Sequence, residues 1–332
     1  MNYHLNQIPD RTTKPRQKGL TMVMDKGLSL RQVEDFLETG ADYTDIVKLG
    51  WATSYVTPNL KEKLALYKSA GIPVYFGGTL FEAFYIRGQF DDYRRILDEF
   101  GMEYAEVSDG SIEMESDIKC ELIRTLATQV TVLSEVGSKD EAKIIPPYKW
   151  IEQMQTELSA GAWKVIGEAR EGGNVGLFRD SGEVRQGLVE EILTQVPEDK
   201  IIWEAPQKSQ QVWFIKLLGA NVNLGNISPS EVIPLETIRL GLRGDTFDHF
   251  LGEIKFVGSH GARARGIARR GDEGGAGLGV EAADIRVGLA VRELLVDVDA
   301  QDVVLADEAV DGFDTVVGEV VAASNTFIDS VF

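Results

Sequence analysis

Short apolar and β-branched runs alternate along residues 20–246 with longer stretches in which apolar residues recur at helical spacing. A short apolar run bounded by glycine or polar residues is typical of a buried strand. Recurrence at positions i, i+3, i+4 and i+7 is typical of an amphipathic helix. Their regular alternation predicts parallel strands joined by crossover helices.

Eight such strand and helix pairs follow one another. They lie at 20–27 and 29–40, 43–51 and 59–71, 73–79 and 80–101, 104–111 and 116–129, 131–137 and 147–161, 163–170 and 183–196, 201–206 and 208–219, and 221–227 and 230–244. A doubly wound sheet usually has fewer strands and a glycine fingerprint after the first one, and no GxGxxG follows residues 20–27. We therefore predict a (β/α)8 TIM barrel at 19–249, preceded by an N-terminal arm at 1–18.

The composition changes beyond the predicted barrel. Residues 251–332 contain no proline, tryptophan or tyrosine, and Lys255 is the single lysine. We expect an acidic extension at 250–332 that is rich in glycine, alanine and valine. Three interpretations remain open for it: a disordered extension, a small accessory domain, or a stretch translated in an unintended frame.

Charge and cysteine usage limit the classes of function. A formal net charge of -19 repels phosphates, so nucleic acid is not an expected partner. The lone cysteine, Cys120, cannot form an internal disulfide, which suits a reducing compartment. Apolar runs are too short for a membrane span, and residues 1–19 lack the core of a signal peptide. We expect a cytoplasmic protein that does not bind membranes.

Charged residues cluster at the predicted carboxyl ends of the strands, where barrel side chains point into the mouth. They are Asp25, Lys26, Lys48, Asp109, Glu135, Lys139, Glu168, Arg170 and Glu204. A charge inside an apolar strand is unfavourable unless it is paired, hydrated or bound to a ligand. A structural ion-pair network would account for single members, but a ligand is the better explanation of the whole set.

This set contains two kinds of charged group, carboxylates and cations. The carboxylates suit a hard cation such as Mg²⁺, which takes oxygen ligands, and their predicted members are Glu135, Glu168, Glu204 and Asp109. The cations suit an anionic substrate, and their members are Lys26, Lys48, Lys139 and Arg170. A phosphorylated carboxylic acid satisfies both demands.

Two further positions are candidates for binding the substrate. The segment APQKSQQ at 205–211 ends the seventh strand and opens a helix, where backbone N–H groups and Lys208 could hold a phosphate. Asn226 lies at the end of the eighth strand. Arg243 and Asp245 close the last unit and could equally form a structural pair.

Seven segments between residues 19 and 247 together resemble the phosphosulfolactate synthase family. They read MDKG, DIVKLGWATS, YFGGTLFE, EVSDGS, SEVG, EAPQKSQQVWFIKLLG and PLETIRLGLRGDTF. The resemblance implies a Mg²⁺-dependent carbon–sulfur lyase that adds sulfite to phosphoenolpyruvate, giving (2R)-2-O-phospho-3-sulfolactate for coenzyme M or sulfolactate biosynthesis. It also implies that Lys139, shortly after SEVG, is the acid that protonates the product. Ala52 departs from the family's usual glycine.

Other functions are compatible with the same residues. Plant heat-stress-associated proteins resemble this family, so a non-catalytic member is one alternative. Another lyase of the phosphoenolpyruvate type is a second, and a Schiff-base aldolase using Lys48 or Lys208 is a third. We also expect a homo-oligomer.

Overall fold

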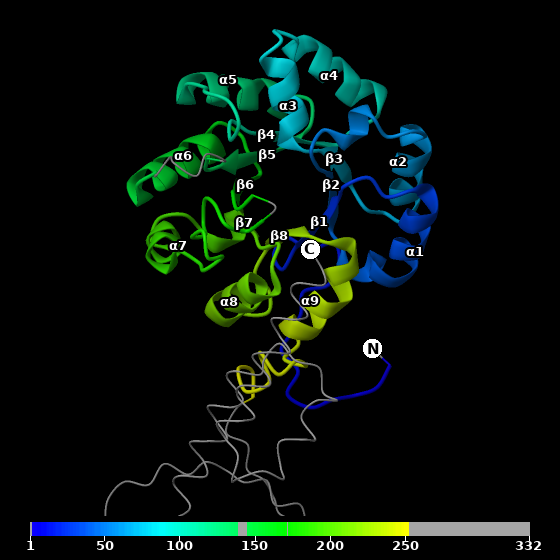
Figure 1. Cartoon of the computed structure of the whole chain (residues 1–332), viewed down its shortest axis with the longest axis vertical. Helices are drawn as coiled ribbons and strands as arrows, with labels where there is room; N and C mark the ends of the chain where they lie inside the picture. Colours follow the sequence, from blue (N-terminus) through cyan, green and yellow to red (C-terminus); the bar gives the residue numbers. More distant parts are fainter. Residues whose placement is uncertain (1, 139–144, 171, 252–332) are drawn as a thin grey trace, which may run out of the picture. The chain divides into compact units, whose positions relative to one another are not determined.

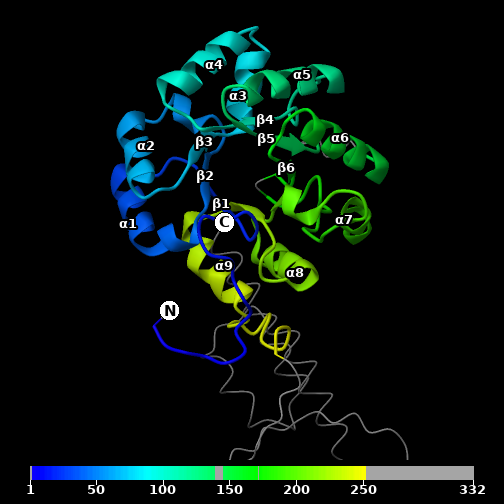
Figure 2. The ribbon, with the colours of Figure 1, turned by 180° about the vertical axis from the view of Figure 1, so that it is seen from behind.

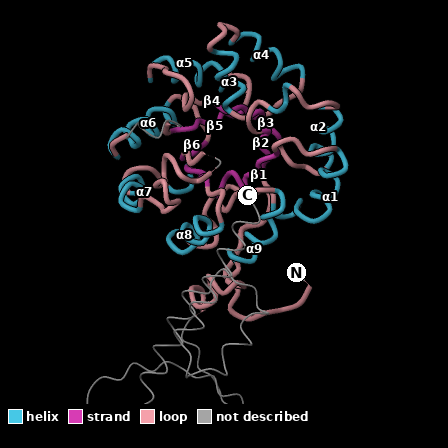
Figure 3. Tube along the Cα trace, viewed as in Figure 1, coloured by secondary structure: helices cyan, strands magenta, loops and turns pink. Residues whose placement is uncertain are grey.

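The computed structural model describes residues 2–138, 145–170 and 172–251, and its strands form one parallel sheet. The strands are β1 (Thr21–Asp25), β2 (Ile46–Leu49), β3 (Val74–Phe76), β4 (Tyr104–Val107), β5 (Thr131–Val136), β6 (Lys164–Gly167), β7 (Ile201–Glu204) and β8 (Leu224–Ile227). Hydrogen-bonded neighbours follow the order β3-β2-β1-β8-β7-β6-β5-β4. Figure 3 shows the strands as a ring.

The ring closes between β3 and β4 through side chains. The Tyr75 hydroxyl on β3 donates to Glu106 Oε2 on β4 at 3.0 Å. The backbone N–H of Gly78, just beyond β3, donates to Glu106 Oε1 at 2.7 Å. One buried carboxylate therefore links the two strands that lie at the ends of the hydrogen-bonded order.

Helices surround the strands on the outside (Figures 1 and 2). They are α1 (Leu30–Gly40), α2 (Leu60–Ser69), α3 (Gly78–Tyr85), α4 (Phe90–Glu99), α5 (Ser116–Ala127), α6 (Pro147–Ser159), α7 (Gln186–Leu193), α8 (Lys208–Leu218) and α9 (Val232–Arg239), with 3₁₀ turns at Ala41–Tyr43, Thr53–Tyr55, Glu198–Lys200 and Pro229–Glu231. The predicted (β/α)8 barrel is confirmed. The single helix expected at 80–101 is two helices, separated near Gly88, whose φ of 67° lies in the left-handed region.

Two stacked layers of side chains fill the barrel interior. The lower layer is apolar and includes Met22, Ile46, Leu133, Ile166 and Ile202. The same strands carry, two residues later, Met24, Lys48, Glu135, Glu168 and Glu204. Side chains at i and i+2 of a strand share a face, so the second set lies next to the apolar one, and four of its five members are charged. This register is what places the site.

The N-terminal segment packs against the end of the barrel at which the strands begin, opposite the charged side chains. Arg11 donates to both carboxylate oxygens of Glu236 in α9, at 2.9 and 3.0 Å. Arg16 pairs with Asp45, just before β2, at 3.0 Å. Lys164, at the start of β6, donates to the carbonyl of Gln17 at 3.0 Å. These contacts close the amino ends of the strands.

The predicted extension at 250–332 lies outside the described residues, apart from residues 250 and 251. Phe250 is partly buried against the hydrophobic core. In the part of the chain that is described, no helix has the length and apolar character needed to cross a membrane.

Candidate active site

The carboxyl ends of the strands surround a cavity of about 440 Å³. It is lined by Met24, Lys48, Trp51, Gly77, Gly78, Thr79, Glu106, Ser111, Glu135, Glu168, Arg170, Gly172, Asn174, Glu204 and Asn226. This end of a (β/α)8 barrel is where such folds carry their active sites. The cavity is therefore the candidate active site.

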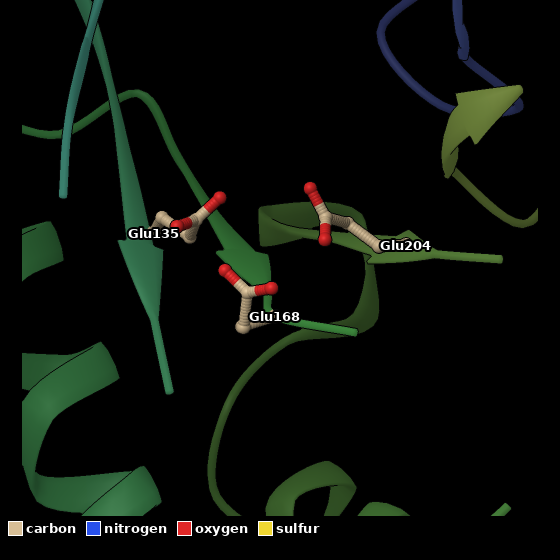
Figure 4. A group of neighbouring side chains, drawn as sticks. All are labelled: Glu135, Glu168 and Glu204. Carbon is tan, nitrogen blue, oxygen red and sulfur yellow. The ribbon is translucent and has the colours of Figure 1, made fainter. Parts of the chain in front are cut away.

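Three glutamates from neighbouring strands converge in the cavity (Figure 4). Glu135 comes from β5, Glu168 directly follows β6, and Glu204 ends β7. One carboxylate oxygen from each lies within 4.8 Å of the others, and all three side chains are buried. Buried carboxylates this close repel one another unless a cation lies between them, and hard divalent cations prefer such oxygen ligands. The chemistry of this donor set fits Mg²⁺.

Asp109, the fourth predicted metal ligand, does not belong to this group. Its carboxylate accepts a hydrogen bond from Lys119 Nζ at 2.8 Å. Asp109 lies beyond the end of β4, in the loop, where the strand register no longer fixes the direction of its side chain. Its role as a ligand stays a prediction.

Lys48, on β2, contacts the carboxylates of three glutamates. Its Nζ lies 3.0 Å from Glu204 Oε1, 3.2 Å from Glu106 Oε2 and 3.5 Å from Glu135 Oε2. Burial alone lowers the pKa of Lys48, but the charges of Glu106 and Glu204, then Tyr75 and Glu135, outweigh it and leave its pKa well above the ordinary lysine value. Lys48 is thus held as an ammonium. A Schiff-base nucleophile must be a neutral amine, so the aldolase alternative finds no support at Lys48.

Glu106 is the acidic residue that the sequence-based prediction missed. It is 1% exposed, lines the cavity and carries the contacts that close β3 onto β4. Its signal was present in the sequence, because Glu106 lies two residues after Tyr104 in the fourth strand, as Glu135 lies two residues after Leu133 in the fifth.

Backbone N–H groups orient the other carboxylates. The N–H of Ala169 donates to Glu204 Oε2 at 3.0 Å, and the N–H of Arg170 donates to Glu168 Oε1. Burial raises the pKa of Glu204, as do Glu135 and Glu106, while Lys48 and the Ala169 N–H act in the opposite direction. The loop after β6 therefore fixes two of the three converging glutamates.

A second buried cluster supports Glu135 from behind. Lys119, on α5, donates to the backbone carbonyl of Glu135 at 2.6 Å and pairs with Glu157 of α6 at 2.9 Å. The hydroxyl of Ser134 donates to the other oxygen of Glu157 at 2.6 Å. Burial raises the pKa of Glu157, and Lys119 and Ser134 counter it. This cluster joins two helices to the strand that carries Glu135.

The predicted substrate-binding residues have different environments. Arg170 lines the cavity, and Lys26 places its ammonium over the Trp51 ring, 4.9 Å from the ring centre. Asn226 also lines the cavity; it is 6% exposed, and its Oδ1 accepts no hydrogen bond from the described residues. Lys208 is exposed and pairs with Asp245 at 3.2 Å. Lys139 lies outside the described residues.

The APQKSQQ segment uses its glutamines to hold the loop after β6. Gln210 Oε1 accepts from the backbone N–H of Gln207 at 3.1 Å, which caps the start of α8. The side-chain amide of Gln207 donates to the carbonyl of Gly172 at 2.6 Å, and that of Gln210 donates to Gly173 at 2.8 Å. These contacts position a loop that borders the cavity. Phosphate binding by Lys208 stays a prediction.

Three known proteins with similar sequences carry the same name, phosphosulfolactate synthase. Residues 9–245 match the family described as (2R)-phospho-3-sulfolactate synthase (ComA). The phosphosulfolactate synthase of Methanothermobacter thermautotrophicus is 43% identical over 244 residues, which is 72% of this chain and 95% of that protein. That of Bacillus subtilis is 41% identical over 250 residues, 74% of this chain and 99% of that protein. That of Methanocaldococcus jannaschii is 46% identical over 237 residues, 70% of this chain and 94% of that protein. With a family match across the barrel and its charged mouth, this chain belongs to the phosphosulfolactate synthase family.

Proposed function

We propose that this chain adds sulfite to phosphoenolpyruvate to give (2R)-2-O-phospho-3-sulfolactate, with Mg²⁺ held by Glu135, Glu168 and Glu204. Its family is one of lyase-type enzymes. The observation that carries the metal assignment is the convergence of three buried carboxylates, with oxygens within 4.8 Å of one another, at the mouth of the barrel.

The reaction forms one carbon–sulfur bond and one carbon–hydrogen bond. The sulfur lone pair of sulfite attacks the methylene carbon of phosphoenolpyruvate, and the π electrons move toward the carboxylate, which becomes an enediolate-like dianion. The neighbouring carbon then takes up a proton. A divalent cation bound at the three glutamates would stabilise the charge that develops on the substrate carboxylate.

The protein's own residues supply binding and the proton. Arg170, which lines the cavity, is suited to hold a phosphate or carboxylate group. Asn226 lines the cavity, where its side-chain N–H groups can donate to an oxygen of an anionic substrate. Lys139 is proposed as the general acid, on the strength of the family resemblance alone.

Product formation from the two substrates tests the proposed reaction. Full-length protein incubated with phosphoenolpyruvate, sulfite and Mg²⁺ should give a phosphorylated product, seen as a new ³¹P resonance and confirmed by mass. Binding of phosphoenolpyruvate without turnover would instead favour the non-catalytic alternative. Absence of any product from folded protein would refute the proposal.

Lys139→Ala tests the proposed acid. General acid catalysis contributes about 10² to 10⁴ in rate, so kcat should fall by that range. Binding of phosphoenolpyruvate, measured by calorimetry, should change much less. A variant with wild-type kcat would remove Lys139 from the mechanism.

Three features of the setting complete the proposal. The product would enter coenzyme M or sulfolactate biosynthesis. We place the reaction in the cytoplasm, in keeping with the single, buried Cys120. We also propose that the protein works as a homo-oligomer, which sedimentation velocity would test.

A further inference from the structure

The ammonium group of Lys48 has the surroundings of a bound cation. An ammonium has three N–H donors and no acceptor. Three carboxylate oxygens, from Glu106, Glu135 and Glu204, lie between 3.0 and 3.5 Å from Nζ. Lys48 is 4% exposed and these glutamates are at most 3% exposed. Its charge is therefore directed at protein carboxylates rather than at open space in the cavity.

Two sets of three carboxylates lie in the mouth and share Glu135 and Glu204. One is the group of Glu135, Glu168 and Glu204. The other is the group of Glu106, Glu135 and Glu204, which contains the Lys48 ammonium. Carboxylates shared between two adjacent cations are the arrangement of two-metal sites. Here one of the two cations belongs to a side chain.

We infer that Lys48 fills the second cation position and so limits the site to a single divalent cation. This inference rests on the metal site of the proposed function. The cavity lining includes four glutamates, and the ammonium offsets part of their repulsion whether or not metal is bound. Because the charge is tethered to β2, it cannot be lost at low metal concentration.

Removing the ammonium should open the second position. In Lys48→Met the side chain keeps a similar length but loses its charge, so Glu106, Glu135 and Glu204 lose the ammonium that contacts all three of them. Mn²⁺ is a suitable probe, because it binds carboxylates and its free form is measured directly by electron paramagnetic resonance. The inference predicts one tightly bound Mn²⁺ per wild-type chain and two per Lys48→Met chain.

Glu106 makes the test specific to this position. Glu106 contacts Lys48 but is not part of the three-glutamate group. The double variant Lys48→Met/Glu106→Gln should therefore return to one Mn²⁺. Lys61→Met is the matched control, since Lys61 is an exposed lysine that pairs with the exposed Glu99 on the surface. It removes one positive charge elsewhere and should bind one Mn²⁺ tightly.

The outcomes separate this inference from the proposed function. One Mn²⁺ in folded Lys48→Met, or two in the double variant, overturns the role of Lys48 and leaves the metal site intact. No tight Mn²⁺ in the wild type overturns the metal site as well. Should Lys48→Met fail to fold, Lys48→Gln, which is also uncharged but keeps a polar end, takes its place and should bind two Mn²⁺, while Glu106→Gln alone should keep one. A Glu106→Gln chain that binds none, or a wild type that binds two, would contradict the inference.

Discussion

The two ends of the barrel bury charge in different ways. At the amino end, Arg239 is fully buried and donates to the carbonyls of Ala220 and Val222 at 2.8 and 2.7 Å, while Arg11 matches both oxygens of Glu236. At the carboxyl end, glutamates line a cavity with Lys48 among them. Charged groups at the amino end bond to other groups of the protein, whereas the carboxylates at the mouth also line a cavity, where we propose that they bind a cation.

This difference indicates that the charged residues at the amino end mainly stabilise the fold, while those at the carboxyl end mainly serve the proposed reaction. Buried charges that are hydrogen-bonded to groups of several elements hold those elements together, and removing one leaves its partners unsatisfied. Like charges that crowd a cavity repel one another, and a cation bound among them would relieve that repulsion. Substitutions at the two ends should therefore affect different measurements.

Glu168→Gln at the mouth should have the largest effect. Loss of one proposed metal ligand is expected to lower kcat/KM by about 10² to 10³, comparable to the loss of another group that stabilises transition-state charge. The unfolding temperature should change little, because Gln keeps an oxygen that can accept from the Arg170 N–H and the substitution removes one of three neighbouring buried carboxylates. Steady-state kinetics and thermal unfolding check the two halves of this expectation. Glu152→Gln, on the exposed surface of α6, is the control and should change neither.

Arg239→Met at the amino end should show the reverse pattern. The carbonyls of Ala220 and Val222 lose their guanidinium donor, at a cost of about 2 to 3 kcal/mol. For a domain of this size that lowers the unfolding temperature by roughly 5 to 10 °C. Activity per folded molecule at low temperature should match the wild type. If Arg239→Met kept its stability, or if the exposed control Arg95→Met lost as much, the assignment of the amino end to stability would be wrong.

Lys164 should give the smallest effect, a dependence of stability on pH. Burial lowers the pKa of Lys164 to about 8, against 10.5 for an ordinary lysine. Between these values the unfolded chain binds the proton and the folded chain does not, so this residue's contribution to stability rises as pH increases. Neutral Lys164 keeps two N–H groups for the carbonyls of Gln17 and Asp199.

The free energy of unfolding of the wild type, relative to Lys164→Met, should therefore rise by about 1 to 3 kcal/mol between pH 8 and pH 10.5. Comparing the two proteins cancels the other titrating groups that they share. Denaturant unfolding at several pH values measures the difference. A constant or falling difference across this range would show that Lys164 stays charged in the folded protein.

The fold was predictable because each strand and helix carries its own periodic pattern. The eight alternating units were enough to predict a closed barrel, and the structure confirms it. The break at Gly88 was not predicted, since the apolar spacing on both sides of it continues that of a single helix. Closure of β3 onto β4 also depends on side-chain contacts of Glu106 that no local pattern indicates.

The convergence of the three glutamates was predictable because strand register controls the direction of their side chains. Glu135, Glu168 and Glu204 each follow an inward apolar residue by two positions, so their convergence comes from the register of β5, β6 and β7. Asp109 lies in a loop, and its side chain turns toward Lys119. Lys208 lies at a helix start, and its side chain turns toward Asp245. Sequence alone does not show such partners, because they come from distant elements or from loops without a fixed geometry.

Removal of divalent metal tests the central claim most directly. Full-length protein treated with a chelator and then freed of it should form no phosphosulfolactate from phosphoenolpyruvate and sulfite, and added Mg²⁺ should restore the rate. Glu168→Gln should require a much higher Mg²⁺ concentration or fail to recover. Undiminished product formation by the metal-free protein would contradict the assignment of the three glutamates to a catalytic cation.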